Sequence, residues 1–391
     1  MVVKTGLESW AARGFPELLG KRVGAIVNAT SVDSRLHHLV DLLFQAKVDL
    51  TVLFAPEHGI RGEAQYMAQV EQTTDRRTGL PVYSLYGSTV ESLSPRPEAL
   101  RRLDALVFDI QDVGSRYYTY AYTMALAMSA AARANIGFYV LDRPNPIGGT
   151  QVEGNLVERR YRSFVGLYEL PNRHGLTIGE LARYLNAEEQ FGADLSIIEC
   201  IGWRRSQYWQ STGLPFVPPS PNMPTPDTAL VYPGMCLCEG TNLSEGRGTC
   251  RPFEQFGAPW LDAQEVAGEL NREDLPGVLF RPASFVPSFD KHGGLPCHGA
   301  MIHVVDRAAF RPVLTGIAVV RAARRLSGSR FRWRTEPYEF VADIPAFDLL
   351  CGNDRIRRGI ESDWPISRLI ADFDEQVATF LARRAPYLLY R

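Results

Sequence analysis

Acidic side chains follow three apolar segments in the first half of this chain. They are Glu57, Asp109, Asp112 and Asp142. Apolar segments of this length are typical of buried parallel strands, and ligands of open α/β sheets bind at the carboxyl ends of the strands. Four carboxylates are therefore expected to converge on one edge of a sheet. Like charges held close raise the pKa of one group and leave another ionised, which is how a general acid and its partner arise. The pattern indicates an enzyme.

Glu57 belongs to the motif Ala-Pro-Glu-His-Gly-Ile-Arg-Gly. Pro56 cannot continue the hydrogen bonding of a strand, and the two glycines allow a tight turn, so Glu57 is expected at the sheet edge. The alternative is an ordinary surface carboxylate in a turn. His58 is expected either to orient Glu57 or to be a plain loop histidine, and the crowding of Glu57, His58 and Arg61 within five residues favours a functional role.

The second acidic segment runs from Asp109 to Tyr118. Residues three apart on a strand face opposite sides, so Asp109 and Asp112 reach one cleft only if the chain turns between them. Alternatively, Asp112 forms an ion pair with Arg116 and Asp109 caps a turn. Tyr117 and Tyr118 suit stacking on a sugar or a base, although an aromatic core is the commoner fate of such residues.

Two further polar segments are candidate substrate contacts. Asp142, Arg143 and Asn145 stand in a proline-rich turn and could bind hydroxyl groups, with local turn hydrogen bonds as the alternative. In the second half, the segment 239–249 combines glycines with matched donors and acceptors. Its candidate ligand-binding residues are Glu239, Asn242, Glu245 and Arg247. A solvated loop is the alternative.

The elements that must position these residues follow an alternating pattern. Expected strands cover residues 21–28, 48–55, 81–85, 106–109, 137–142 and 194–200. Expected helices cover residues 36–46, 97–103, 121–134 and 177–186, the last opening with the capping box Thr177-x-x-Glu180. Strands alternating with helices predict an α/β fold with a Rossmann-like, doubly wound and mainly parallel sheet.

A second α/β region follows a segment with seven prolines between residues 215 and 233. Its expected helices cover residues 262–271, 309–326 and 366–384, and its expected strands cover 299–305 and 338–341. The predicted organisation is a catalytic domain, 1–205, and an auxiliary α/β domain, 206–391, which contributes a substrate-binding loop.

Composition excludes several classes of function. Lysine and arginine number 42 against 44 acidic residues, so the net charge of −2 offers no basic surface for nucleic acid or an anionic membrane. No apolar run is long enough for a membrane span, and the N-terminal residues lack the pattern of a secretory signal. The sequence as it stands therefore predicts a cytoplasmic protein, or a secreted or periplasmic one if a leader has been removed.

The sequence predicts no cofactor. No Gly-x-Gly-x-x-Gly follows the first strand, and the segment 239–249 is not a Walker loop, so nucleotide binding is not indicated. Cys236, Cys238 and Cys250 could in principle hold zinc, but their spacing is not that of a standard zinc finger. We interpret these cysteines as plain thiols and predict no metal site.

The long motifs resemble those of a bacterial family of exo-β-N-acetylmuramidases, formerly a DUF1343-type domain of unknown function. The resemblance is carried by residues 56–59, 109–120, 142–146, 239–249, 256–260 and 384–390 and spans nearly the whole chain. It implies removal of single N-acetylmuramic acid residues from the non-reducing ends of peptidoglycan fragments. It also implies a cleft between the two domains, no metal or nucleotide, and a catalytic glutamate at Glu57.

Glycoside hydrolysis generally needs a proton donor and a second carboxylate. We assign Glu57 as the general acid and Asp109 or Asp112 as its partner. The 2-acetamido group of the substrate is an alternative nucleophile, as in substrate-assisted families. The lactyl carboxylate of muramic acid should meet an arginine, and the candidates are Arg61, Arg116, Arg143 and Arg247.

Two other hypotheses compete with the muramidase. The strand-end aspartates could hold Mg²⁺ for phosphoryl transfer. Alternatively, the tyrosines and the polar loop could belong to a non-catalytic protein that binds sugars or muropeptides. The muramidase hypothesis requires that Glu57 and the Asp109/Asp112 pair share a pocket with the segment 239–249.

Overall fold

The first part of the molecule is built on a seven-stranded sheet. We describe a computed structural model covering residues 2–57, 60, 73–87 and 89–391. The strand order among these residues is β3-β4-β2-β1-β5-β6-β7, and neighbouring strands are parallel except β3 and β4. The strands are β1 (Arg22–Val27), β2 (Asp49–Ala55), β3 (Thr73–Thr74), β4 (Pro81–Ser84), β5 (Ala105–Asp109), β6 (Gly137–Leu141) and β7 (Leu195–Ile198). The predicted doubly wound, mainly parallel sheet is confirmed.

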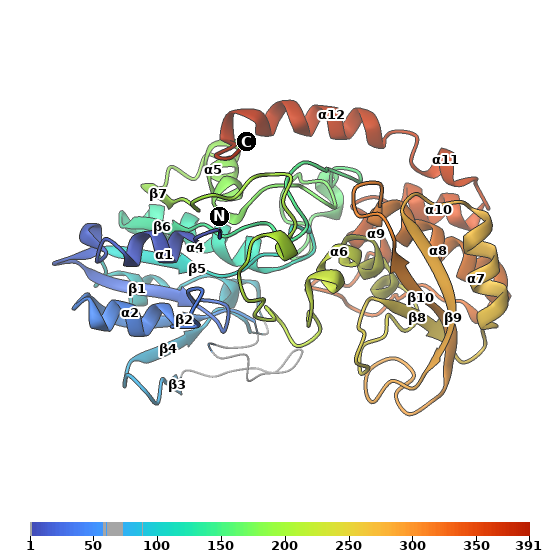
Figure 1. Ribbon diagram of the computed structural model, residues 1–391, viewed down its shortest axis with the longest axis horizontal. Helices are drawn as coiled ribbons and strands as arrows, with labels where there is room; N and C mark the ends of the chain where they lie inside the picture. Colours follow the sequence, from blue (N-terminus) through green and yellow to red (C-terminus); the bar gives the residue numbers. More distant parts are fainter. Residues whose placement is uncertain (1, 58–59, 61–72, 88) are drawn as a thin grey trace.

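Helices cover both faces of this sheet (Figure 1). They are α1 (Gly6–Ala11), α2 (Leu39–Gln45), α3 (Pro97–Leu100), α4 (Tyr120–Ala134) and α5 (Ile178–Glu188). Strand β5 shows the consequence, because Val107 packs in one core with α1 and α2 while Leu106 and Phe108 pack in the other with α4 and α5. A strand buried on both faces is apolar throughout, which is why its sequence was recognisable. The capping box of Thr177 and Glu180 is present at α5.

The second part contains a three-stranded antiparallel sheet flanked by helices. Its order is β8-β10-β9, with β8 (Gln255–Ala258), β9 (Val278–Phe285) and β10 (Cys297–Val304). The helices are α6 (Pro226–Met235), α7 (Ala263–Arg272), α8 (Pro312–Ser327), α9 (Ala346–Cys351), α10 (Arg355–Glu361), α11 (Ile366–Leu369) and α12 (Phe373–Arg384). The predicted boundary at residues 205/206 falls between the two sheets and stays a prediction.

Two sequence predictions in this part are wrong. Residues 338–341 are not a strand of a sheet but a tight turn, in which Tyr338 and Val341 exchange backbone hydrogen bonds. The single helix expected over 366–384 is interrupted between α11 and α12. None of the helices that the structure describes is both long and apolar enough to cross a bilayer.

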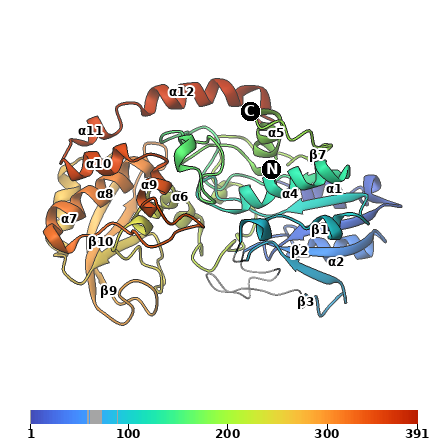
Figure 2. The ribbon, with the colours of Figure 1, turned by 180° about the vertical axis from the view of Figure 1, so that it is seen from behind.

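The end of the chain returns to the first part. Helix α12 runs back from the second part, and the two termini lie near each other (Figures 1 and 2). Phe380 packs edge-on against Tyr184 of α5, with ring centroids 5.5 Å apart. The hydroxyl of Tyr390 donates to Asp142 Oδ2 at 2.6 Å. The last residues therefore pack on the sheet of the first part.

Buried polar bonds fix the edge of the sheet where β5 and β6 end. The guanidinium of Arg143 donates to both carboxylate oxygens of Asp109, from Nε at 2.6 Å and from Nη2 at 2.9 Å. Asp109 is completely buried and Arg143 is 4% exposed. The same guanidinium donates to the carbonyl of Val32 at 3.1 Å. The pair joins the ends of two strands to the loop after β1.

Helices α6 and α8 approach each other through two glycines. A Cβ atom on Gly316 would lie 2.1 Å from the carbonyl oxygen of Gly234, and one on Gly234 would lie 1.8 Å from that of Pro312. Both separations are far below van der Waals contact, and the obstructing atoms are backbone. The close packing of these helices therefore requires glycine at both positions.

We predict that Gly316→Ala lowers the free energy of unfolding by about 3 kcal/mol or more, because the helices must separate. Gly268→Ala in α7 is the control, since its Cβ would meet only the end of the Arg272 side chain at 3.7 Å. Alanine there should stabilise the helix by roughly 1 kcal/mol. Urea denaturation followed by circular dichroism measures both. Equal effects of the two changes would contradict the assigned packing.

We predict that Arg143→Met destabilises the protein by about 3–5 kcal/mol, because it leaves the Asp109 carboxylate buried without its cation. The matched control is Arg22→Met, which removes a similar bidentate pair with Asp104 whose side chains are 50% and 41% exposed. The control should change the free energy of unfolding far less. A fully stable Arg143→Met protein would show that Asp109 does not depend on this ion pair.

Candidate active site

A small cavity between the two parts of the molecule brings three carboxyl groups together. Glu57 reaches it from the end of β2, and Glu239 and Glu339 reach it from the second part. Its volume is about 60 Å³. Other lining residues are Tyr117, Tyr118, Thr119, Tyr120, Val165, Ser220, Asn222, Met223, Tyr232, Arg247, Phe253 and Tyr338.

Glu57 is held beside the beginning of helix α4. Thr119, the residue before this helix, donates its hydroxyl to Glu57 Oε2 at 3.0 Å. The hydroxyl of Tyr120 donates to the Glu57 backbone carbonyl at 3.3 Å. The amino end of a helix carries partial positive charge, which favours a carboxylate next to it. Glu57 thus lies at the sheet edge where the sequence placed it.

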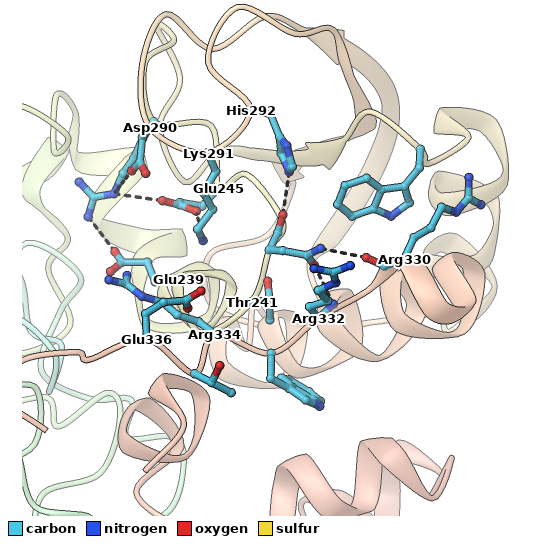
Figure 3. Close-up of a pocket in the computed structure, with 15 residues that line it drawn as sticks. Glu239, Thr241, Glu245, Asp290, Lys291, His292, Arg330, Arg332, Arg334 and Glu336 are labelled. Carbon is cyan, nitrogen blue, oxygen red and sulfur yellow. Dashed lines mark hydrogen bonds and ion pairs between the residues drawn. The ribbon is translucent and has the colours of Figure 1, made fainter. Parts of the chain in front are cut away.

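The loop 239–249 reaches the cavity through a cluster of opposite charges, of which Figure 3 labels Glu239, Glu245 and Lys291. Arg247 contacts Glu239 Oε1 at 2.7 Å and Glu245 Oε1 at 3.1 Å. Lys291 donates to Glu245 Oε2 at 2.9 Å. Burial acts to raise the pKa of Glu239, but the charge and hydrogen bond of Arg247 outweigh it, so this pKa is lowered. Glu239 and Arg247 line the cavity with Glu57, whereas Glu245 pairs with Arg247 without lining the cavity.

The side chain of Asn242 bonds to backbone groups of Arg330 and Arg332 and does not line the Glu57 cavity. Its Nδ2 donates to the carbonyl of Arg330 at 2.9 Å, and its Oδ1 accepts from the N–H of Arg332 at 2.9 Å. These two bonds fix the segment 330–336 against the loop 239–249. Asn242 instead lines a larger cavity on the other side of Glu239 and Arg247.

Glu339 is a carboxylate that sequence reasoning missed. It occupies the first central position of the turn 338–341, with φ of 46°, and Phe340 follows with φ of 68°. A two-residue turn with both central residues left-handed normally favours asparagine and glycine. Neither is present, so the backbone is strained at both positions, and such strain concentrates at functional sites. Burial and the charges of Glu57 and Glu239 raise the pKa of Glu339 to about 8.

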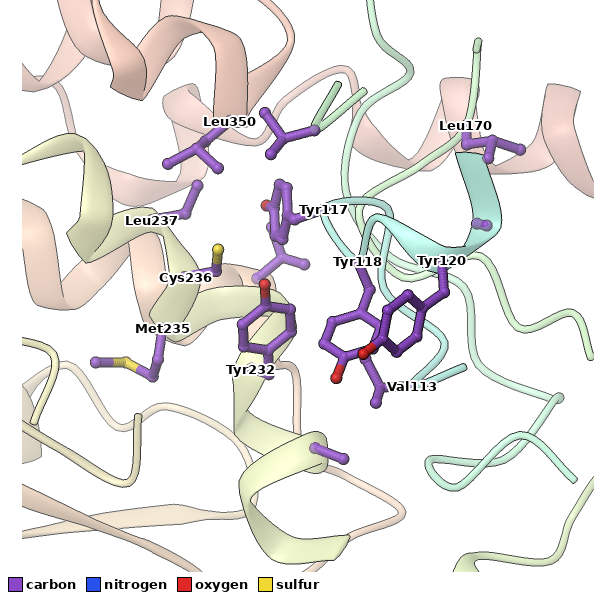
Figure 4. Close-up of a cluster of buried hydrophobic side chains, with 14 of the residues drawn as sticks. Val113, Tyr117, Tyr118, Tyr120, Leu170, Tyr232, Met235, Cys236, Leu237 and Leu350 are labelled. Carbon is purple, nitrogen blue, oxygen red and sulfur yellow. The ribbon is translucent and has the colours of Figure 1, made fainter. Parts of the chain in front are cut away.

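The predicted tyrosines line the cavity but belong to the core between the two parts (Figure 4). Tyr117 is 2% exposed and Tyr118 is 8% exposed. Both pack edge-on against Tyr232 of α6, with centroids 6.2 and 5.8 Å away. Tyr117 also pairs with Asn172 through its hydroxyl. Most of the surface of both tyrosines is therefore buried in an aromatic core, which is the commoner alternative stated for them.

Several predicted site residues are not brought to the cavity. Asp109 and Arg143 form an ion pair with each other. The Arg116 guanidinium donates to the carbonyls of Asn155, Leu170 and Leu350 at 2.7–2.8 Å, so it neither pairs with Asp112 nor faces a ligand. Here the sequence assignment is corrected, because a buried guanidinium needs fixed acceptors and takes them from backbone.

The remaining rim residues serve the local structure. Asp142 accepts from Thr177 Oγ1 at 2.8 Å, from the Gly179 N–H at 2.7 Å and from Tyr390. Asn145 donates to the carbonyl of Leu176 at 2.9 Å.

Asp112 is buried near the cavity without lining it. Its Oδ2 accepts from the N–H of Gly114 at 2.7 Å, and burial raises its pKa to about 7.

Two predicted residues, His58 and Arg61, lie outside the described residues. Among the residues that are described, no three His, Cys, Asp or Glu side chains group as metal ligands. Cys236 and Cys238 are buried and Cys250 is exposed. The strand-end aspartates Asp109, Asp112 and Asp142 are bonded separately, so the described geometry does not gather them as the phosphoryl-transfer hypothesis requires.

Comparisons with known proteins identify the family of this chain. Family models of the N-terminal and C-terminal parts of exo-beta-N-acetylmuramidase NamZ match residues 23–227 and 230–390. The peptidoglycan beta-N-acetylmuramidase NamZ of Bacillus subtilis (strain 168) is 46% identical over 389 residues, which are 99% of this chain and 91% of that protein.

Crystal structures of two DUF1343 family proteins from Bacteroides fragilis NCTC 9343 share the fold. Their TM-scores are 0.89 and 0.78 at 38% and 30% identity, and each match covers 100% of this chain and 99% of the other. The resemblance carried by the sequence motifs is confirmed. This chain belongs to the NamZ family of exo-β-N-acetylmuramidases, and it is a glycosidase.

Proposed function

We propose that this enzyme releases N-acetylmuramic acid from the non-reducing ends of peptidoglycan fragments, with Glu57 and Glu339 as its pair of catalytic carboxyl groups. The observation that carries the proposal is the meeting of these two side chains, from different parts of the molecule, in one cavity. Glycoside hydrolysis generally needs such a pair. Glu339 thus replaces Asp109 or Asp112, which we assigned from the sequence as the second catalytic carboxyl group.

The surroundings of the two carboxyl groups favour different roles. With a pKa raised to about 8, Glu339 holds its proton at neutral pH and can give it to the leaving oxygen. Glu57 accepts a hydroxyl hydrogen bond beside the positive end of α4, an arrangement that suits a carboxylate acting as base or nucleophile. From the sequence we assigned Glu57 as the proton donor, so our proposal exchanges the two roles.

Arg247 is our candidate for the lactyl carboxylate of the terminal muramic acid. Of the four arginines that the sequence put forward, Arg116 and Arg143 are bonded internally and Arg61 is outside the described residues. Arg247 lines the cavity with both proposed catalytic groups. Its planar guanidinium can bind a carboxylate through two parallel hydrogen bonds.

Replacing each carboxyl group should separate the roles. Glu339→Gln should lower kcat for the disaccharide of N-acetylmuramic acid and N-acetylglucosamine by about 10²–10⁴-fold. The same variant should lose far less on 4-nitrophenyl N-acetylmuramide, because a good leaving group needs no proton. Glu57→Gln should lose activity on both substrates. Glu375→Gln, on the exposed side of α12, is the control.

The reverse pattern, with leaving-group dependence only in Glu57→Gln, would return the proton donor to Glu57. Full activity of Glu57→Gln on both substrates would remove Glu57 from the mechanism.

The pH dependence provides an independent test. Because the proton donor works only when protonated, kcat/KM should fall as the pH rises through about 8, the pKa of Glu339 in the free enzyme. The Glu339→Gln protein should lack this alkaline limb while retaining any acidic one. An alkaline limb of equal position in both proteins would assign it to another group.

A further inference from the structure

A second and much larger cavity opens beside the proposed catalytic pocket. Its volume is about 820 Å³, and it lies wholly on the second part of the molecule. Glu239 and Arg247 line both cavities, so the two are neighbours across this ion pair. Figure 3 shows the walls, which come from the loop 239–247, residues 290–292 and the segment 330–336. The described reaction uses only the small cavity, which leaves this one without a role.

Three arginines line one wall of the larger cavity. Arg332 and Arg334 lie two positions apart on an extended segment, and Arg330 ends the short 3-10 helix that precedes it. The segment is held by backbone hydrogen bonds from Asn242 N–H to the Arg332 carbonyl at 3.0 Å and from Arg334 N–H to the Gly240 carbonyl at 2.9 Å. Alternate residues of an extended chain face the same side. The backbone pairing thus fixes the segment of Arg332 and Arg334, and together with Arg330 these residues form a row of three arginines along the cavity.

The positive charge of this row is not neutralised as that of Arg247 and Lys291 is. Those two cations pair with Glu239 and Glu245. Within the described chain, the exposed guanidinium of Arg332 donates no hydrogen bond and forms no ion pair, and that of Arg330 has one long contact of 3.5 Å to the Ser327 carbonyl. Arg334 lies over the Tyr338 ring at 4.7 Å. The row is therefore available for an anionic ligand.

The cavity also offers aromatic surface. Trp260 and Trp333 line it, and both are half-buried. Trp260 is fixed by a hydrogen bond from Nε1 to Ser327 Oγ at 3.0 Å and by the edge-on ring of His292 at 5.2 Å. Rigid, partly exposed tryptophans combine an apolar face with a polar edge, which suits stacking against a sugar ring. Arginines next to tryptophans favour a sugar that carries a carboxylate.

We propose that this cavity binds the second muramic acid residue of a longer glycan, with its lactyl carboxylate at Arg332 between Arg330 and Arg334. The inference rests on the proposed function, because the terminal muramic acid must occupy the carboxylate pocket for the rest of the glycan to reach the neighbouring cavity. The inference adds that the enzyme acts more efficiently on longer glycan chains than on the disaccharide. The alternating order of peptidoglycan supplies this second carboxylate two sugars beyond the terminal residue.

The test compares the disaccharide with the tetrasaccharide that contains two such units. The wild-type enzyme should hydrolyse the tetrasaccharide with about tenfold higher kcat/KM, mainly through KM, as one charge-assisted pair contributes. A tetrasaccharide whose internal lactyl group is a primary amide should lose this advantage. Arg332→Gln should lower the ratio of the two kcat/KM values about tenfold. Arg358→Gln, an exposed arginine on α10, should keep the ratio.

Equal kcat/KM values for both substrates in the wild type would overturn the proposal. So would an Arg332→Gln protein that loses equally on both substrates, which would assign Arg332 to the terminal residue instead. Calorimetric titration of Glu57→Gln with the tetrasaccharide and its amide tests binding without turnover. Tighter binding of the tetrasaccharide than of its amide would support carboxylate binding in the larger cavity. If the wild type hydrolysed neither substrate, that result would contradict the proposed function and not the binding proposal.

Discussion

The position of the proposed catalytic pocket depends on one buried cation. Arg116 donates to three backbone carbonyls, two from the loops of the first part and one, that of Leu350, from helix α9 of the second part. Its neighbours in sequence, Tyr117 and Tyr118, pack against Tyr232 at the same junction. These carbonyls replace hydrogen bonds that the buried guanidinium gives up to water. The two parts are thereby held in the register that brings Glu57 opposite Glu339.

The pocket combines a rigid side and a strained side. Glu57 follows a central strand and is fastened to the start of α4, so its position follows from the core of the sheet. Glu339 lies on a turn whose two central residues adopt left-handed backbone without glycine. Tyr338, on the same turn, donates to Glu239 at 2.8 Å, which ties the turn to the ion pair of Arg247. The strain is thus maintained by bonds made elsewhere in the pocket.

The strands, the doubly wound sheet and the capping box of α5 were predictable because each is specified by a few neighbouring residues. Glu57 was found for the same reason, since a proline and two glycines mark the end of a strand. The roles of Asp109 and Arg116 were not predictable, because their partners are Arg143 and backbone carbonyls contributed from as far away as Leu350. Glu339 was missed because its turn resembles an apolar strand in sequence, and only the meeting of the two parts brings it near Glu57.

The hydrogen bond between Asp142 and Tyr390 joins residues that are 248 positions apart in the chain. Asp142 is completely buried at the end of a central strand, and burial raises its pKa to about 7. During synthesis, the first sheet emerges from the ribosome long before the tyrosine that completes the surroundings of this carboxylate. The surroundings of Asp142 are therefore completed only after the whole second part of the molecule has been synthesised.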